Sequence, residues 1–282
     1  MTELESLVKE YRETIEKFVR RYQKAGERVY GLENTTPFGI KYVKTSCSSF
    51  SPFDYAIILP DDYERLLPFY GLTSIKYDLV HEVSEGLADV KSNFVLPNLC
   101  KNAKFEDFNE VNWSNYLVNK GIEEGRAIVG AKRIILSLKE RSVLKEHEEG
   151  VAGLPSNWSI QCAEFFRSIM KLGYTGNVST SDLYRTISRP LEPSNKVDED
   201  LLIIKEFLES LHSPYGIRAY VLIQKLDKKQ FQRFTEKWEP RDFNEKIKGI
   251  NPVPYYFNQR VCFDIPREHE RIIEEEIKQW LK

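Results

Sequence analysis

The sequence predicts an α+β protein with two domains: a mixed β-sheet domain that opens with a long amphipathic helix, and a second domain that is mainly helical. Residues 38–97 contain short apolar runs bounded by prolines and glycines, which is typical of strands. Residues 3–25 and 197–212 repeat apolar side chains at helical spacing. A chain of 282 residues is long enough for two compact units. We therefore place the domains at residues 1–150 and 151–282.

The helix predicted over residues 3–25 carries an apolar seam. Its members recur at alternating spacings of four and three, which is the pattern of a heptad repeat; they are Leu4, Val8, Tyr11, Ile15, Phe18 and Tyr22. Such a seam packs either on the core of its own domain or on the same helix of a second copy. The second arrangement would make the protein a homodimer and would favour a structural or oligomerisation role.

A second face of the same helix is basic. This face contains Lys17, Arg20, Arg21, Lys24 and Arg28. A row of cations on one helix face can bind successive phosphates of a nucleic acid. The alternative is an ordinary solvated face, because Glu13, Glu16 and Glu27 are interspersed along it.

The rest of the first domain is predicted to combine strands with helices. Strands are favoured over 38–45, 53–59, 75–83 and 86–92. A polar loop is expected over 46–52, and a short helix over 61–70, where a proline and an aspartate give a helix start. Helical spacing returns over 116–147, and the Gly/Pro-containing segment 150–155 is expected to be the loop between the domains.

The second domain is predicted to be three helices followed by a βαβα unit. The helices are expected over 158–172, 182–187, 197–212, 227–238 and 266–281. The two strands of the βαβα unit are expected over 217–226 and 255–265, because both segments hold apolar and aromatic runs bounded by turn residues.

Three helices and then a strand, over residues 158–226, resemble a winged-helix domain. The resemblance implies that the third helix, 197–212, enters the major groove of DNA. Its exposed residues are mainly acidic and would repel phosphates. The basic residues that the resemblance places near nucleic acid are Arg185 and Arg189, on the second helix, together with Lys196 and Arg218.

An acidic residue on one predicted strand and an acid-x-lysine on another resemble the active sites of restriction-endonuclease-like nucleases. Asp54 opens one strand, and Asp89 and Lys91 lie on another. The resemblance implies that Asp54 and Asp89 hold Mg²⁺, with Glu82 or Glu85 as a third carboxylate ligand. Because side chains two apart share a face of a strand, the lysine would stand beside a metal-activated water. The alternative is that Asp54 caps its strand and that the other two residues form a surface pair.

Charge and motif content limit the function classes further. Lys and Arg number 41 and Asp and Glu 43, for a net charge of −2, which argues against nucleic-acid binding over the whole surface but leaves room for a local basic patch. The sequence holds neither the glycine-rich phosphate-loop motifs nor a G-x-S-x-G nucleophile motif. No apolar run is long enough to span a membrane, and the N-terminus is not a secretory signal, so we expect a cytoplasmic location without a membrane partner.

We therefore expect a nucleic-acid-associated intracellular protein that binds DNA. The alternatives are a Mg²⁺-dependent nuclease that uses Asp54, Asp89 and Lys91, and a structural or oligomerisation protein.

Overall fold

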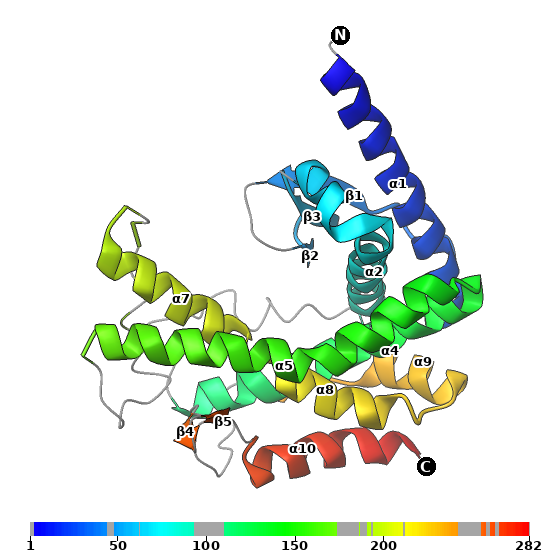
Figure 1. Cartoon of the computed structure of the whole chain (residues 1–282). Coiled ribbons are helices and arrows are strands. Elements are labelled where there is room, and N and C mark those ends of the chain that lie inside the picture. Colours follow the sequence, from blue (N-terminus) through cyan, green and yellow to red (C-terminus); the bar gives the residue numbers. More distant parts are fainter. Residues whose placement is uncertain are drawn as a thin grey trace. The chain divides into compact units, whose positions relative to one another are not determined.

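The computed structural model of the chain gives a broadly α+β fold that is mostly helical (Figure 1). The residues that it describes are 3–43, 48–61, 63–92, 110–173, 186, 191–192, 194–210, 212–241, 255–257, 260–262 and 265–281. Within these ranges the largest sheet has three strands. The predicted class is confirmed at this level, but the sheet is much smaller than expected.

The chain forms two compact units, each built from several segments. Unit 1 contains Met1–Val95, Arg126–Val151 and Ile223–Trp238. Unit 2 contains Leu96–Gly125, Ala152–Leu222 and Glu239–Lys282. Helices α4 (Glu110–Leu138) and α5 (Arg141–Lys171) contribute residues to both units. The division into domains at residue 150 stays a prediction.

Unit 1 is organised around the packing of α1 (Glu3–Tyr30) on α2 (Tyr63–Ser92). The predicted N-terminal helix is confirmed and continues to Tyr30. Ile15 and Tyr22, two members of the predicted seam, are fully buried within this unit. The seam therefore serves the core of its own chain along this part of α1, and a homodimer stays a prediction.

The last turn of α1 is joined to the core by a buried polar link. The Tyr30 hydroxyl lies 2.7 Å from Ser84 Oγ, which donates to the carbonyl oxygen of Ala127. Gly130 of α4 faces this link, and a Cβ there would lie 1.9 Å from Tyr30 Oη. The glycine is therefore needed for the close approach of α1, α2 and α4.

The sheet of unit 1 is mixed. Strand β1 (Gly39–Val43) is parallel to β3 (Ala56–Pro60), and β2 (Ser49–Ser51) pairs with the other edge of β3 in antiparallel orientation. Two of the predicted strands thus exist in shortened form, whereas β2 lies in the segment expected to be a polar loop. Phe38 and Phe50 are buried, with ring centroids 5.0 Å apart.

The strands predicted over 75–83 and 86–92 are wrong, because both segments belong to α2. This helix is broken at Gly71 (φ 68°, ψ 160°) and then continues to Ser92. One row of buried apolar residues is spaced by four, namely Ile75, Leu79, Val83 and Leu87, and Val80 and Ala88 beside it are buried as well. A spacing of four satisfies both the two-residue period of a strand and one turn of a helix, so the alternation did not distinguish them.

The loop predicted over 150–155 is also wrong, because α5 passes through it without a break. A proline removes a single backbone hydrogen bond from a helix, and the residues on both sides of Pro155 keep α5 helical. The break in the helical stretch predicted over 116–147 lies instead at Lys139, whose φ of 58° separates α4 from α5.

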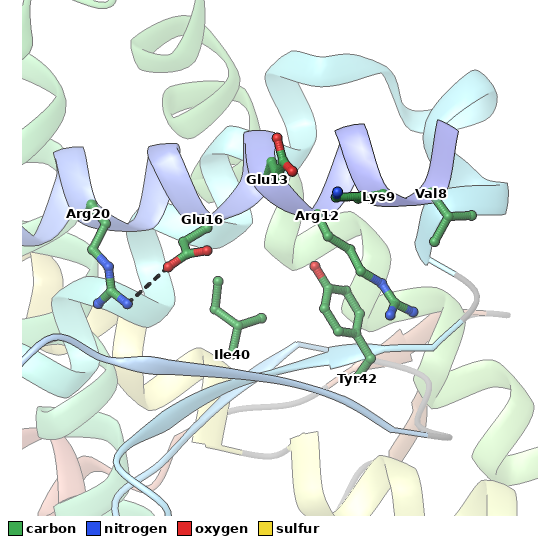
Figure 2. A pocket seen from close by; sticks show the side chains of 8 residues that line it. All are labelled: Val8, Lys9, Arg12, Glu13, Glu16, Arg20, Ile40 and Tyr42. Carbon is green, nitrogen blue, oxygen red and sulfur yellow. Dashed lines mark hydrogen bonds and ion pairs between the residues drawn. The ribbon is translucent and has the colours of Figure 1, made fainter. Parts of the chain in front are cut away.

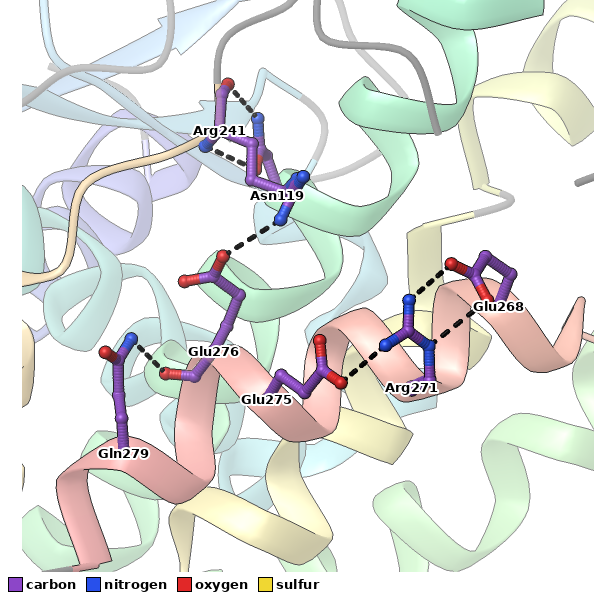
Figure 3. Close-up of polar contacts among 7 residues, drawn as sticks. All are labelled: Asn119, Arg241, Glu268, Arg271, Glu275, Glu276 and Gln279. Carbon is purple, nitrogen blue, oxygen red and sulfur yellow. Dashed lines mark hydrogen bonds and ion pairs between the residues drawn. The ribbon is translucent and has the colours of Figure 1, made fainter. Parts of the chain in front are cut away.

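Unit 2 contains α7 (Lys196–Ser210), α8 (His212–Ile223), α10 (Arg267–Lys278) and the 3₁₀ turn η2 (Gln279–Leu281), with the paired strands β4 (Tyr255–Phe257) and β5 (Arg260–Cys262). Figure 3 shows polar contacts of this unit: Asn119 bonds both backbone groups of Arg241, whose guanidinium pairs with Glu276. Tyr215 and His269 share a buried hydrogen bond of 2.8 Å.

The strand predicted over 217–226 is wrong, because most of it is the helix α8. Buried Tyr215, Ala219 and Leu222 of α8 are spaced by four and three, which is one face of a helix. The predicted wing of the winged-helix segment is therefore helical, and the C-terminal βαβα unit is incorrect. The helices expected over 197–212, 227–238 and 266–281 are confirmed as α7, α9 (Lys228–Lys237) and α10 with η2.

Among the described residues, no helix has the length and apolar character needed to cross a bilayer.

Candidate nucleic-acid interface

The residues of the predicted nuclease site lie on elements other than those expected. Asp54 is in the turn before β3, where its carboxylate accepts hydrogen bonds from Lys41 Nζ (2.5 Å) and Ser51 Oγ (3.1 Å). These bonds, chiefly the one from Lys41, lower the pKa of the Asp54 carboxyl. Asp54 therefore forms a surface ion pair with β1.

Asp89, Lys91 and Glu82 all belong to helix α2. Positions two apart do not face each other on a helix, so the reason for grouping Asp89 with Lys91 no longer holds. The Asp89 carboxylate lies 3.5 Å from the buried guanidinium of Arg126, and Lys91 Nζ lies 3.2 Å from Glu236. Glu82 is buried and accepts a hydrogen bond from Ser48 Oγ.

The parts of the chain that the structure describes contain no group of three or more His, Cys, Asp or Glu side chains able to hold a metal ion. Arg185 and Arg189, predicted to lie near nucleic acid, fall outside the described residues.

The five basic residues of α1 that were predicted to contact phosphates divide into two groups. Arg20 bonds Glu16 and the carbonyl oxygen of Phe38, and Arg21 lies 3.0 Å from Glu140. The other three are exposed and form neither an ion pair nor a side-chain hydrogen bond with another described residue; they are Lys17, Lys24 and Arg28. Spacings of seven and four put these three cations on one helix face.

Arg28 lies where α1 ends, beside a cavity of about 490 Å³. Gly31 closes the helix in the left-handed region (φ 65°), which a glycine adopts without strain. The cavity is lined by residues from α1, α4 and α9, namely Arg28, Val29, Arg133, Ser137 and Lys228. Its described lining thus holds three cations, one hydroxyl and no carboxylate. We call it the basic cavity.

Arg133, on α4, is held in place by neutral groups. Its guanidinium nitrogens donate to the carbonyl oxygens of Leu226 (2.5 Å) and Asp227 (3.3 Å). The guanidinium carbon lies 4.4 Å from the ring centroid of Phe231. Burial lowers the pKa of Arg133, although a guanidinium stays protonated in proteins. Its positive charge is thus partly desolvated.

Lys228 is positioned by the start of α9. Asp227 caps this helix by accepting from the backbone N–H of Gln230, and the Gln230 side chain accepts from Asp227 N–H in return. Gln232 then donates to the carbonyl oxygen of Val29 (2.9 Å), which joins α9 to the last turn of α1. Lys228 is exposed and forms no ion pair with the described residues.

A larger cavity, of about 690 Å³, lies between α1 and β1 and differs in charge (Figure 2). Its lining includes the carboxylates of Glu13 and Glu16 as well as three cations. The Arg12 guanidinium stacks on the Tyr42 ring at 4.5 Å, and Arg20 pairs with Glu16. Carboxylates repel phosphates, so this cavity is the poorer candidate for an anion.

Sequence reasoning identified Arg28 but missed Arg133 and Lys228. The signal for Lys228 was the cluster of lysines at the start of the predicted helix 227–238. Arg133 gave no such signal, because its place beside Arg28 depends on the packing of α4 against α1 and α9.

Comparisons with protein-family models, with curated proteins and with solved structures found no match to this chain.

Proposed function

We propose that the protein binds nucleic acid, DNA in the first place, through one basic face of unit 1. This basic face consists of Lys17, Lys24 and Arg28 on α1, Arg133 on α4 and Lys228 on α9. The observation that supports it best is the basic cavity, where three cations converge with no carboxylate in the described lining. Phosphates are the anions that such a row of cations attracts most strongly in a cell.

The ion pairs of α1 support the choice of residues. Arg20 and Arg21 are engaged by Glu16 and Glu140, so they offer less charge to a ligand. Lys17, Lys24 and Arg28 have no ion-pair partner within the described part of the chain, and their spacing puts their charges on a single face. The negative net charge of the whole chain is compatible with this, because affinity depends on the local field at the contact.

The test is the salt dependence of binding to single- and double-stranded DNA and RNA. The three α1 cations alone contribute about −2 to −3 to the slope of log affinity against log salt, measured between roughly 50 and 200 mM. The variant Lys17→Gln/Lys24→Gln/Arg28→Gln is expected to flatten this slope and to weaken binding to all sequences alike.

A matched control removes cations that are held by carboxylates elsewhere. Lys145→Gln/Arg271→Gln/Lys278→Gln neutralises three exposed residues that pair with glutamates on their own helices. It is expected to leave binding within twofold of the wild type. Failure of all four nucleic acids to bind at about 50 mM salt, or an equal loss in the control, would contradict the proposal.

The nuclease alternative gains no support from the positions of Asp54, Asp89 and Lys91, and it stays a prediction from the sequence.

A further inference from the structure

The basic cavity differs from the rest of the basic face because it is concave and because its charges come from three helices. We propose that it receives the terminal phosphate of a nucleic-acid strand, a phosphomonoester, so that the protein prefers phosphorylated strand ends. The inference rests on the proposed nucleic-acid function and specifies which part of the strand the cavity takes.

Charge is the first reason. An internal phosphodiester carries one negative charge, whereas a phosphate monoester carries about −1.5 to −2 near neutral pH. The cavity offers Arg28, Arg133 and Lys228, together with the positive end of the α9 dipole. Three cations around one phosphate match a dianion better than a monoanion.

The second reason is the state of Arg133. A guanidinium taken partly out of water is normally compensated by a carboxylate. The hydrogen-bond acceptors of Arg133 are instead the carbonyl oxygens of Leu226 and Asp227, and its flat face lies on Phe231. These groups orient the guanidinium. The negative charge of the Asp227 carboxylate acts on it through space, but Arg133 forms no ion pair with a described residue, so an anion in the cavity would complete its environment.

The third reason is the α9 start itself. Lys228 is the first residue of α9 and is followed by Lys229, and no acidic residue lies in the first turn. A cation at a helix N-terminus opposes the helix dipole and lowers the stability of the helix. A bound dianion attracts both the lysine and the positive end of the helix and so outweighs their repulsion, which gives the lysine a role in binding.

The volume of the site is large enough for a strand end. A cavity of about 490 Å³ lies in the range of small-ligand sites and has room for a terminal nucleotide. An internal phosphate would require the strand to leave the cavity on both sides. A strand whose end occupies the cavity leaves on one side only, and its next phosphates can follow Lys24 and Lys17 along α1.

The experiment compares strands that differ only at their ends. Single strands of about 12 nucleotides carry a 5′-phosphate, a 3′-phosphate or hydroxyls at both ends, and their affinities are measured by fluorescence anisotropy at one salt concentration. The wild type is expected to bind at least one phosphorylated strand about tenfold more tightly than the hydroxyl strand. Lys228→Gln is expected to bring this preference to within twofold. Lys24→Gln, the matched control, is expected to weaken all three strands while keeping the preference.

Each outcome separates this inference from the proposed function. Equal binding of all three strands by the wild type overturns the terminal-phosphate site but leaves nucleic-acid binding standing. A preference that survives in Lys228→Gln also overturns it. If no strand binds, the terminal-phosphate inference and the proposed nucleic-acid function both fail. In that case thermal unfolding is measured with inorganic phosphate. A stabilising shift in the wild type that is lost in Lys228→Gln would identify a phosphate site without a nucleic-acid function.

Discussion

Two partly or fully buried arginines of α4 show how differently a guanidinium can be accommodated. Arg126 is 2% exposed and has a carboxylate partner in Asp89, whereas Arg133 has carbonyl oxygens. Loss of one member of a buried ion pair leaves the other charge uncompensated, which costs far more than loss of a surface pair. The two residues therefore predict different responses to mutation.

Asp89→Asn is expected to lower the free energy of unfolding by about 2 to 4 kcal/mol, because it leaves Arg126 charged and buried. Lys91→Gln breaks a pair whose glutamate is half exposed, and it is expected to cost less than about 1 kcal/mol. Urea denaturation of both variants measures the difference. Similar stabilities for the two variants would contradict a structural role for the Asp89 carboxylate.

For individual residues, the sequence predicted which positions carry exposed cations better than it predicted which residues those cations lie beside. Lys24 and Arg28 were identified from helical spacing, and they are exposed as expected. Asp89 and Lys91 were grouped on the assumption of a strand, and that grouping is lost on a helix. Arg133 is distant from Arg28 in sequence, so only tertiary packing joins them.

In helix α9, the positive charge of Lys228 at the first position lowers the stability of the helix. Lys228→Glu is expected to raise the free energy of unfolding by about 0.3 to 1 kcal/mol, because it replaces an unfavourable cation at the helix start. The same change should abolish the preference for phosphorylated strand ends. Thermal unfolding and strand binding measured on one preparation test both parts. A destabilised variant would show that Lys228 has a structural role that the geometry does not reveal.

Helix α4 offers a test of close packing. Gly130→Ala places a Cβ within 2.3 Å of Ser84 Oγ as well as against Tyr30, and overpacking of this kind costs about 1 to 3 kcal/mol. Gly150→Ala is the matched control in α5, because its Cβ would lie 3.4 Å from the Tyr77 ring, an ordinary contact. The control is expected to stabilise the protein by roughly 0.5 to 1 kcal/mol through helix propensity. A lower denaturation midpoint for Gly130→Ala and a higher one for Gly150→Ala, both relative to the wild type, would confirm the packing argument. A Gly130→Ala protein as stable as the wild type would contradict it.

The helices at both ends of the chain were predictable, whereas α2 and α8 were not. The terminal helices show apolar spacings of three and four over many residues, which no strand can satisfy. Helix α2 has a row of buried residues at every fourth position, and α8 is short and apolar on more than one side. In both cases the local pattern fits two structures, and tertiary packing decides between them.

At the scale of the whole molecule, the described part of each unit contains a fully buried histidine that must stay neutral. His147 in unit 1 and His269 in unit 2 are both fully buried. Burial lowers the pKa of each to about 4, and for His147 the positive charges of nearby His81 and Lys132 act in the same direction, whereas Glu268 opposes the shift at His269. In the unfolded chain a histidine has a pKa of about 6.5.

These values fix the sign of the pH dependence. Between about pH 6.5 and pH 4 the unfolded state binds protons that the folded state excludes, so the free energy of unfolding must fall as the pH falls through this window. Each histidine contributes a slope of about 1.4 kcal/mol per pH unit. The window from roughly pH 6.5 to 5 is the informative one, because the carboxyls of the unfolded chain titrate mainly below it.

His147→Phe is therefore expected to reduce the pH dependence of unfolding between about pH 6.5 and 5, and His269→Phe to do the same. The second variant also removes the partner of the Tyr215 hydroxyl, so its stability will be lower at every pH. The slope, rather than the absolute stability, is thus the measurement that isolates the buried imidazole. Urea denaturation at several pH values in one buffer of constant ionic strength provides it. A slope that is unchanged in both variants would mean that neither histidine is kept neutral by burial, and that the acid sensitivity arises from other groups.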